Sequence, residues 1–416
     1  MPLQEFHYRD NQLYCEHAAL SAIAQAVGTP AYVYSARAIR ENYRAYERAL
    51  ADVPHQIHYA VKANSSLAVL ALLAAERAGF DIVSGGELYR VLQAGGDPST
   101  VVYSGVGKTA AELKYALEQG IGAFNCESEQ ELEMLQEVAA RIGARPSVAL
   151  RVNPNINAKT HPYISTGLSE HKFGIGLQAA ESLYGEAAKW SPLEFTGISC
   201  HIGSQIFDTS VFEEVLSQML GLAARLRVRG LPIQGINLGG GLAVGYEQGQ
   251  SSASIAGYCR MLSSAFAGSR FVLGLEPGRS IVGQAGILLT SVLVYKQADR
   301  KTFLVVDGAM NDLLRPALYS AHHEIVPVID HGGPRLQCDV VGPVCESGDF
   351  FATGRELPAC SAGDLLAIAT AGAYGFVQAS NYNSRPRAAE VLVDGEAFRI
   401  VRKRETREDL IRGETL

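Results

Sequence analysis

The chain has 416 residues, of which 47% are hydrophobic and 19% are charged, and its formal net charge at pH 7 is −7. A chain of this length is expected to form two domains, or one barrel with an attached module, rather than one ordinary core. The charge is spread along the sequence, so the composition argues against nucleic acid or an anionic membrane as a partner and favours a small-molecule role.

The ends and the cysteines of the sequence bear on its location. The N-terminal segment carries charges and lacks the apolar centre of a signal peptide, and no later segment reaches the roughly 18 uninterrupted apolar residues of a membrane span. The seven cysteines are scattered and form no Cys-x-x-Cys pair, which indicates neither a disulfide framework nor a zinc knuckle. We therefore expect a cytoplasmic protein.

The first predicted element is a β-hairpin at residues 6–16, around Asp10-Asn11. From Tyr34 to Arg279 short apolar strands then alternate with amphipathic helical stretches, which is the pattern of repeated βα units. The strands are expected at 57–63, 79–84, 100–105, 122–128, 147–154, 196–204, 235–241 and 271–279, and the helical stretches include 67–78, 111–119, 128–142 and 211–228.

Eight parallel strands with interleaved helices over about 250 residues match a (β/α)₈ barrel in strand count and length. A doubly wound sheet is the alternative. Against it, no strand is followed by a G-x-G-x-x-G turn, because the glycines of 239–245 have a different spacing.

After Gly286 strands follow one another across turns, which predicts an all-β module without interleaved helices. We expect the N-terminal hairpin to join this module. The predicted fold is thus α/β plus all-β, with a TIM-type barrel at 34–279 and a C-terminal domain at 280–416, of β-sandwich or β-barrel type, that receives the strands of 1–33. The strands of the module are expected at 287–297, 301–308, 323–329, 336–345, 364–375 and 388–403.

Polar residues lie at the carboxyl ends of the expected barrel strands, where barrel enzymes place their sites. Lys62 ends the first strand, His201 lies at the end of the sixth and Glu276 at the end of the eighth. Taken singly, a strand-end lysine is usually an exposed charge and a lone histidine is usually structural. Their convergence on one rim favours a functional site.

The glycines after the seventh and eighth strands, with the hydroxyl of Ser204, match the barrel arrangement that binds a phosphate through backbone N–H groups. A desolvated Lys62 beside such a site suggests an amine that bonds to a phosphate-bearing aldehyde. Pyridoxal 5′-phosphate meets both requirements, and Glu276 is placed to pair with its pyridine nitrogen.

Nine motifs resemble, in order, those of the diaminopimelate decarboxylase family, and several are shared with the ornithine and arginine decarboxylases of the same fold group. The resemblance covers nearly the whole chain. It implies a pyridoxal-phosphate enzyme that converts meso-2,6-diaminopimelate to L-lysine and CO₂, the final step of lysine biosynthesis. The motifs are YAVKAN, DIVSGGEL, HKFGI, HIGSQ, NLGGGL, EPGRS, RPALY, VGPVCESGD and GAYG.

The resemblance also implies roles for residues of the barrel. Lys62 would bond to the cofactor's aldehyde, His201 would stack on its ring, and Glu276 would keep the pyridine nitrogen protonated. Tyr374 would contact both cofactor and substrate. The phosphate would be held by Ser204, Gly239, Gly240, Gly241, Gly278 and the backbone of Arg279.

For the C-terminal domain, the resemblance implies that Cys345 supplies a proton and that Glu346 binds the far amino group of the substrate. In this fold group their loop comes from the partner subunit, which implies a homodimer with shared active sites. Arg279, Arg315 and Tyr319 match the family's residues for the distal carboxylate, which ornithine lacks.

Three alternatives stay open at this point. One is another decarboxylase of this fold, acting on ornithine, arginine or a carboxylated polyamine. The second is a racemase on a related barrel, which needs two opposed bases and retains the carboxylate. The third is a non-catalytic protein, such as a small cofactor-binding carrier or an enzyme-like regulator with a decayed site. The intact Lys62, Glu276, Cys345 and Glu346 argue against decay.

Two further motifs receive less specific predictions. We expect no metal site, because the adjacent His322 and His323 lack a third ligand at a suitable spacing. Residues 156–171 have the length and polarity of a lid. His171 within them favours a structural role.

Overall fold

The computed structural model describes residues 4–156, 172–299 and 301–416. The chain forms two compact units. The first unit, rich in β-strands, comprises Met1–Glu41, Gly245–Ser251 and Ile281–Leu416, and the second, the barrel unit, comprises Asn42–Val244 and Ser252–Ser280. No helix in the described ranges is both long enough and apolar enough to cross a membrane.

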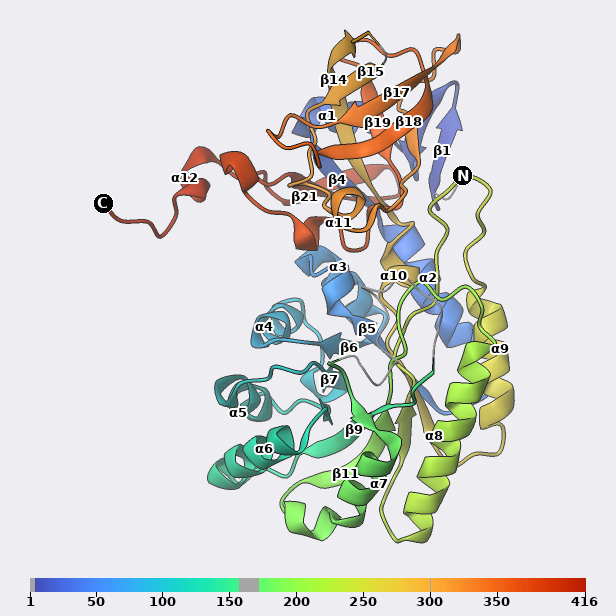
Figure 1. Cartoon of the computed structure of the whole chain (residues 1–416), viewed down its shortest axis with the longest axis vertical. Coiled ribbons are helices and arrows are strands. Elements are labelled where there is room, and N and C mark those ends of the chain that lie inside the picture. Colours follow the sequence, from blue (N-terminus) through green and yellow to red (C-terminus); the bar gives the residue numbers. More distant parts are fainter. Residues whose placement is uncertain (1–3, 157–171, 300) are drawn as a thin grey trace. The chain divides into compact units, whose positions relative to one another are not determined.

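Within the described ranges of the barrel unit, eight parallel strands close into a ring (Figure 1), and a ninth short strand, β10 (Ile175–Gly176), pairs in parallel with the end of β9. The ring closes where the last strand pairs with the first. All eight strands coincide with predicted ones, so the barrel prediction is confirmed. They are β5 (His55–Ala60), β6 (Gly79–Ile82), β7 (Val101–Tyr103), β8 (Ala123–Cys126), β9 (Ser147–Asn153), β11 (Glu194–Ser199), β12 (Gly235–Asn237) and β13 (Val272–Leu275).

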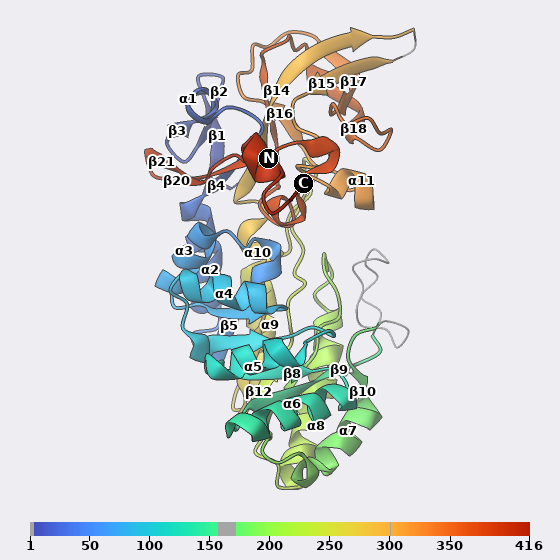
Figure 2. The same ribbon diagram turned by 90° about the vertical axis from the view of Figure 1, so that its left-hand side faces the viewer.

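Helices surround these strands, as Figure 2 shows for α4, α5 and α6. Several begin at a side chain that caps the free N–H groups of the first turn. Thr109 forms a capping box with Glu112 at the start of α5, and Ser128 caps α6. The helices are α2 (Ala36–Ala49), α3 (Leu67–Ala75), α4 (Gly85–Gln93), α5 (Ala110–Glu118), α6 (Glu129–Ile142), α7 (Leu177–Gly185), α8 (Val211–Val228) and α9 (Ile255–Phe266).

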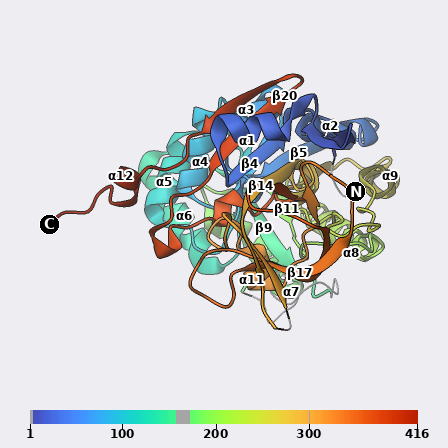
Figure 3. The same cartoon turned by 90° about the horizontal axis from the view of Figure 1, so that it is seen from above.

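The β-rich unit contains one large sheet with the strand order β18-β17-β15-β14-β4-β20-β21, and β19 pairs with both β14 and β16. Beyond β21 the chain leads away from the strands of this unit to α12 (Arg407–Leu410) and the C-terminus (Figure 3). The strands are β4 (Ala31–Ser35), β14 (Gly286–Gln297), β15 (Thr302–Val306), β16 (Ile325–Pro327), β17 (Arg335–Val341), β18 (Phe350–Pro358), β19 (Leu365–Ile368), β20 (Ala389–Asp394) and β21 (Ala397–Arg402).

Two features of this unit differ from the sequence prediction. A short helix, α11 (Arg315–Tyr319), interrupts the strands, so the expectation of a module without helices was wrong. Pro316 lies in its first turn, where the missing N–H costs nothing. Strand β18 was not predicted, because its polar residues and Gly354 weaken the apolar pattern.

The N-terminal hairpin joins the β-rich unit, as predicted. Strands β1 (Phe6–Arg9) and β2 (Gln12–Cys15) pair across Asp10 and Asn11, both with positive φ, as a two-residue hairpin turn requires. Strand β3 (Ala18–Ala19) and helix α1 (Leu20–Val27) follow. The backbone N–H of Leu13 donates to Val328 O at 2.7 Å, and its side chain lies in a core that includes Ile287.

The core that the N-terminal hairpin shares with the large sheet leads to a prediction for stability. Leu13 is fully buried, so Leu13→Ala should lower the free energy of unfolding by about 2–5 kcal/mol, through lost burial and the cavity left behind. Ile400→Ala, at a half-exposed position on β21, is the control and should change it by less than about 0.5 kcal/mol. Urea unfolding monitored by circular dichroism measures both. Equal stability of the two variants would contradict a shared core.

Candidate functional site

Lys62 lies one turn beyond the first barrel strand. Strand β5 ends at Ala60, and Lys62 is the middle residue of a 3₁₀ turn at Val61–Ala63 rather than the last strand residue. Its Nζ lies 2.8 Å from Oδ2 of Asp81, whose side chain is fully buried on β6. Because the carboxylate is removed from water, it holds the ammonium in one place more strongly than a surface partner would.

Lys62, His201 and Glu276 all line one cavity of about 170 Å³ among residues at or beyond the carboxyl ends of the strands. The barrel therefore brings together three predicted residues from the first, sixth and eighth strands. The other residues that line the cavity are Val83, Ser104, Gly105, Asn125, Arg151, Phe173, Ser199 and Cys200.

Glu276 is a buried carboxyl group with a strongly perturbed pKa. Burial, together with the nearby charge of Asp81, raises the pKa to about 8, against the opposing effects of Lys62 and Arg151. Asn237 donates from Nδ2 to Oε1 of Glu276 at 2.8 Å, and Asn125 donates to the same oxygen at 3.4 Å. In the protein alone, the carboxyl group of Glu276 is therefore mostly protonated at neutral pH.

His201 is held as a neutral ring. Burial lowers its pKa well below the ordinary value, and the charges of Arg151 and Lys62 act in the same direction. Its Nδ1 accepts a hydrogen bond from the backbone N–H of Gly240 at 3.1 Å, so the ring proton belongs on Nε2. A neutral, flat ring of this kind can pack against another ring without placing a positive charge beside it.

The glycine turns leave no space for side chains. A Cβ on Gly240 would lie 2.2 Å from the carbonyl oxygen of Glu276, and one on Gly241, whose φ is +118°, would lie 2.4 Å from that of Gly203. These positions require glycine because the turn after β12 approaches the backbone that follows β13, at Gly240, and the backbone that follows β11, at Gly241. Nearby, Arg279 donates from its guanidinium to Oγ of Ser204 at 3.3 and 3.4 Å.

A second buried lysine differs from Lys62 in its chemistry. Lys108 donates to the carbonyl oxygens of Gly105 and Asn125 and to Oε1 of Glu131, at 2.6–2.8 Å. These three hydrogen bonds use the three protons of an ammonium group, which fixes Lys108 as a structural cation. Lys62, with a side chain 37% exposed to the cavity, is the lysine that a ligand can reach.

Four polar residues of this region were not predicted from the sequence: Asp81, Asn125, Arg151 and Asn237. Each lies within a barrel strand, whereas the predicted site residues lie at strand ends. Arg151 pairs with Glu127 at 2.9 Å and lies 4.9 Å from the ring centroid of Phe173. The available signal was a charged or amide residue inside an apolar strand of a parallel barrel, where both faces are otherwise buried.

In the β-rich unit, Cys345 and Glu346 lie on an exposed loop after β17. The carboxylate of Asp349 shapes this loop, accepting the backbone N–H groups of Met310 and Val344 at 2.7 Å each. The N–H of Cys345 donates to Oδ1 of Asn383 at 3.2 Å, and Oε2 of Glu346 accepts from the Tyr382 hydroxyl at 2.8 Å. The thiol and carboxylate therefore stand on an ordered surface loop.

Three further predicted residues, Arg315, Tyr319 and Tyr374, also belong to the β-rich unit. Arg315 is buried, donates to Nε2 of His323 at 2.8 Å, and lies 4.3 Å from the ring centroid of Tyr246. Tyr319 ends α11 and is partly exposed. Tyr374 has a φ of +56°, an uncommon conformation for a tyrosine. His171 and the proposed lid, apart from Ile156, lie outside the described residues.

Comparisons with known proteins agree with this geometry. Residues 36–283 match the family described as "Pyridoxal-dependent decarboxylase, pyridoxal binding domain". A diaminopimelate decarboxylase from Pseudomonas aeruginosa is 53% identical over 100% of this chain and 99% of its own.

Two solved structures are also similar to this chain. Diaminopimelate decarboxylase from Helicobacter pylori complexed with L-lysine has a TM-score of 0.91, 41% identity and coverage of 94% and 98% of the two chains. The enzyme from M. jannaschii in co-complex with L-lysine has a TM-score of 0.94, 34% identity and coverage of 100% and 99%.

The raised pKa of Glu276 predicts a pH-dependent stability of the cofactor-free protein. Between the ordinary value of 4.5 and about 8 the folded state binds a proton that the unfolded state releases. This contribution to stability is therefore full below pH 4.5 and is lost as the pH rises through about 8. Glu276→Gln removes the titrating group, so its thermal unfolding midpoint should fall less over this range than that of the parent.

The control is Glu133→Gln, at an exposed carboxylate on α6, which should follow the parent across the same pH range. Scanning calorimetry at a series of pH values measures all three proteins. Parallel curves for Glu276→Gln and the parent would show that Glu276 ionises normally in the folded protein.

Proposed function

The chain belongs to the diaminopimelate decarboxylase family of pyridoxal-dependent enzymes, and from this membership we propose that it converts meso-2,6-diaminopimelate to L-lysine and CO₂. This reaction is the last step of lysine biosynthesis. The observation that carries the proposal is one barrel cavity that brings a reachable amine, Lys62, together with the buried carboxyl group of Glu276 and the neutral ring of His201.

The donor groups of the barrel fit pyridoxal 5′-phosphate. Lys62 offers an amine for an aldehyde, Glu276 a buried carboxyl group for a pyridine nitrogen, and His201 a flat neutral face. We assign the phosphate to Ser204, Gly239, Gly240, Gly241, Gly278 and the backbone of Arg279, where crowded glycine turns expose backbone rather than side chains. When bound, this cofactor supplies an electron-withdrawing ring that stabilises the charge left as CO₂ departs.

The residues of the barrel would prepare this chemistry in defined ways. Asp81 accepts a hydrogen bond from Nζ of Lys62 and thereby holds this amine at the cavity. The raised pKa of Glu276 means that it has a proton to share with a pyridine nitrogen at neutral pH, and the resulting ion pair would be well shielded from water. His201 can remain neutral throughout, because its Nδ1 is already an acceptor for Gly240.

The β-rich unit would supply the groups that act on the substrate. We propose a homodimer in which the site receives Cys345 of the partner subunit as the proton donor and Glu346 of the partner subunit for the far amino group. Arg279, Arg315 and Tyr319 would bind the distal carboxylate, and Tyr374 would contact cofactor and substrate. The exposed, ordered loop that carries Cys345 and Glu346 supports this assignment, since it leaves both groups accessible to a second chain.

We also propose a cytoplasmic location. All seven cysteines lie in the described ranges as free thiols, and the exposed Cys345 would be at risk of oxidation outside a reducing compartment. A proton-donating thiol is useful only while it stays reduced, so location and proposed role support each other.

The substrate proposal predicts CO₂ release from meso-diaminopimelate, with ornithine, arginine and lysine giving little, because they lack the distal carboxylate that three cationic or polar side chains would bind. Release of labelled CO₂ from each amino acid measures this preference. Activity on ornithine alone, or racemisation without CO₂, would contradict the proposal.

The proposed role of Lys62 makes a separate prediction. In the same assay of CO₂ release, Lys62→Ala should lose roughly a hundredfold or more in rate, whereas an exposed-lysine control, Lys114→Ala, should keep the parent rate.

The shared-site proposal predicts complementation. Lys62→Ala and Cys345→Ala should each be nearly inactive, yet mixed dimers should contain one intact site, restoring about a quarter of the activity in a random mixture. Differently tagged subunits verify that mixed dimers form. The matched control combines Lys62→Ala with His201→Ala, two barrel residues of the same subunit, and should restore nothing. Verified mixed dimers of the first pair that stay inactive would contradict a shared site.

A further inference from the structure

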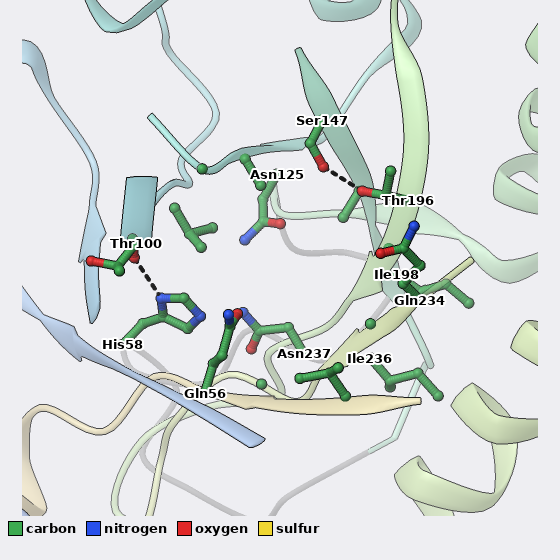
Figure 4. A pocket seen from close by; sticks show the side chains of 18 of the residues that line it. Gln56, His58, Thr100, Asn125, Ser147, Thr196, Ile198, Gln234, Ile236 and Asn237 are labelled. Atoms are coloured by element: carbon green, nitrogen blue, oxygen red, sulfur yellow. Dashed lines mark hydrogen bonds between the residues drawn. The ribbon is translucent and has the colours of Figure 1, made fainter. Parts of the chain in front are cut away.

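A second cavity lies among the amino-terminal halves of the barrel strands and has a volume of about 260 Å³. Figure 4 shows the side chains of Gln56, His58, Asn125 and Asn237 directed toward a common space. Gln56, Ser99 and Gln234 line the cavity and are exposed, so solvent can reach it from this end of the barrel. It is separate from the cavity that Lys62 lines.

The polar groups of this cavity are neutral hydrogen-bonding groups. Nδ1 of His58 donates to the carbonyl oxygen of Thr100 at 3.0 Å. Burial lowers the pKa of His58, which favours an uncharged ring. The hydroxyls of Ser147 and Thr196, on the neighbouring strands β9 and β11, bond to each other at the wall of the cavity. A cavity of this size with such a lining holds water rather than an ion, because water satisfies both donors and acceptors.

Asn125 and Asn237 lie between this hydrated space and Glu276. Both line the amino-terminal cavity, and both donate to Oε1 of Glu276, at 3.4 and 2.8 Å respectively. Asn125 also lines the cavity that contains Lys62 and Glu276. The two amides are thus the groups that face water on one side and the carboxyl group of Glu276 on the other.

The orientation of Asn237 is fixed by its two partners. Its Oδ1 accepts the backbone N–H of Gly239 at 2.8 Å, so its Nδ2 must be the atom that faces Glu276. The backbone N–H of Glu276 in turn donates to the carbonyl oxygen of Gly239 at 2.8 Å. One amide therefore ties the glycine turn after β12 to the carboxyl group after β13.

We propose that Asn237, with Asn125 beside it, is a positioning residue that occupies Oε1 of Glu276 and separates this carboxyl group from the water of the amino-terminal cavity. Oε2 is thereby reserved for the pyridine nitrogen, which gives Glu276 one rotamer and one proton-sharing partner. The inference deepens the proposed function and rests on it, because it concerns the residue assigned to the cofactor ring.

The pKa of Glu276 depends on keeping water away from its Oε1. Water at Oε1 would stabilise the charged carboxylate, lower its pKa and offer a competing partner for the proton. An acceptor in place of the Nδ2 donor would have the opposite effect on the pKa, through repulsion between two oxygens. Either change would alter how firmly the ring nitrogen is held protonated.

Asn237→Asp tests the proposal, because it keeps the acceptor for Gly239 and removes only the donor to Glu276. The pH midpoint of the bound cofactor's absorption spectrum should rise by about one unit or more, through repulsion between two carboxyl groups. The dissociation constant for pyridoxal phosphate should change less than tenfold, since the glycine turn is preserved. The rate constant kcat should fall roughly tenfold, with KM for diaminopimelate little changed.

Ser147→Ala is the matched control, because it changes the polar lining of the same cavity at a hydroxyl that bonds to Thr196 rather than to Glu276. It should leave the spectral midpoint unchanged. Asn125→Ala should shift the midpoint in the opposite direction to Asn237→Asp, because it admits water to Oε1, and by a smaller amount, since its hydrogen bond is longer. An unchanged midpoint in Asn237→Asp would overturn the proposal, as would an equal shift in Ser147→Ala.

A failed prediction for Asn237 can be distinguished from failure of the proposed function. If the parent protein takes up pyridoxal phosphate, shows a visible absorption band that borohydride abolishes, and releases CO₂ from diaminopimelate, the proposed function stands. The spectral titrations of the variants then decide the role of Asn237 alone.

Discussion

The pairing of the last barrel strand with the first is the constraint on which the site depends. Strands β13 and β5 run side by side in parallel, with Leu275 opposite Ile57, and the N–H of Ala60 donates to the carbonyl oxygen of Pro277 at 3.1 Å. This closure brings Lys62 and Glu276, from distant parts of the chain, to one cavity. It needs small residues, because a Cβ on Gly278 would lie 2.9 Å from the Cβ of Ala63.

Once the barrel is closed, its polar interior must satisfy the charges that it buries, since an unpaired buried charge costs several kcal/mol. Ion pairs do this for Lys62 with Asp81, and for Arg151 with Glu127. Glu276 is treated differently, with amide donors at one oxygen and burial that keeps it protonated. The barrel thus places a carboxyl group that is ready to share a proton in the same cavity as an amine that Asp81 holds in position.

The sequence was sufficient to predict the barrel, the β-rich module and the residues at strand ends, because each follows a local pattern. Alternation of apolar strands and amphipathic helices identifies the eight strands, and motifs identify Lys62, His201 and Glu276. Asp81, Asn125, Arg151 and Asn237 could not be found in this way. Their function depends on which residues face the barrel interior, and that depends on register and closure rather than on local pattern.

The same reasoning applies to Arg315, whose side chain is set by contacts that no motif reveals. Nδ1 of His323 lies 2.7 Å from the carbonyl oxygen of Ala369 and donates to it, which makes Nε2 the acceptor for the guanidinium. The ring of Tyr246 lies beneath the same guanidinium, 4.3 Å away. Arg315 is therefore ordered before any ligand arrives.

A pre-ordered guanidinium binds a carboxylate without losing further side-chain freedom, so the conformational-entropy cost of binding is small. Under the proposed function, a substrate that lacks the distal carboxylate makes no ion pair with this cation, and discrimination of that kind is much stronger than selection by size alone. Under the proposed function, preference for diaminopimelate over ornithine thus depends on His323 and Tyr246 as much as on Arg315. Specificity then comes from the packing of the β-rich unit, whereas the bond-breaking chemistry comes from the barrel.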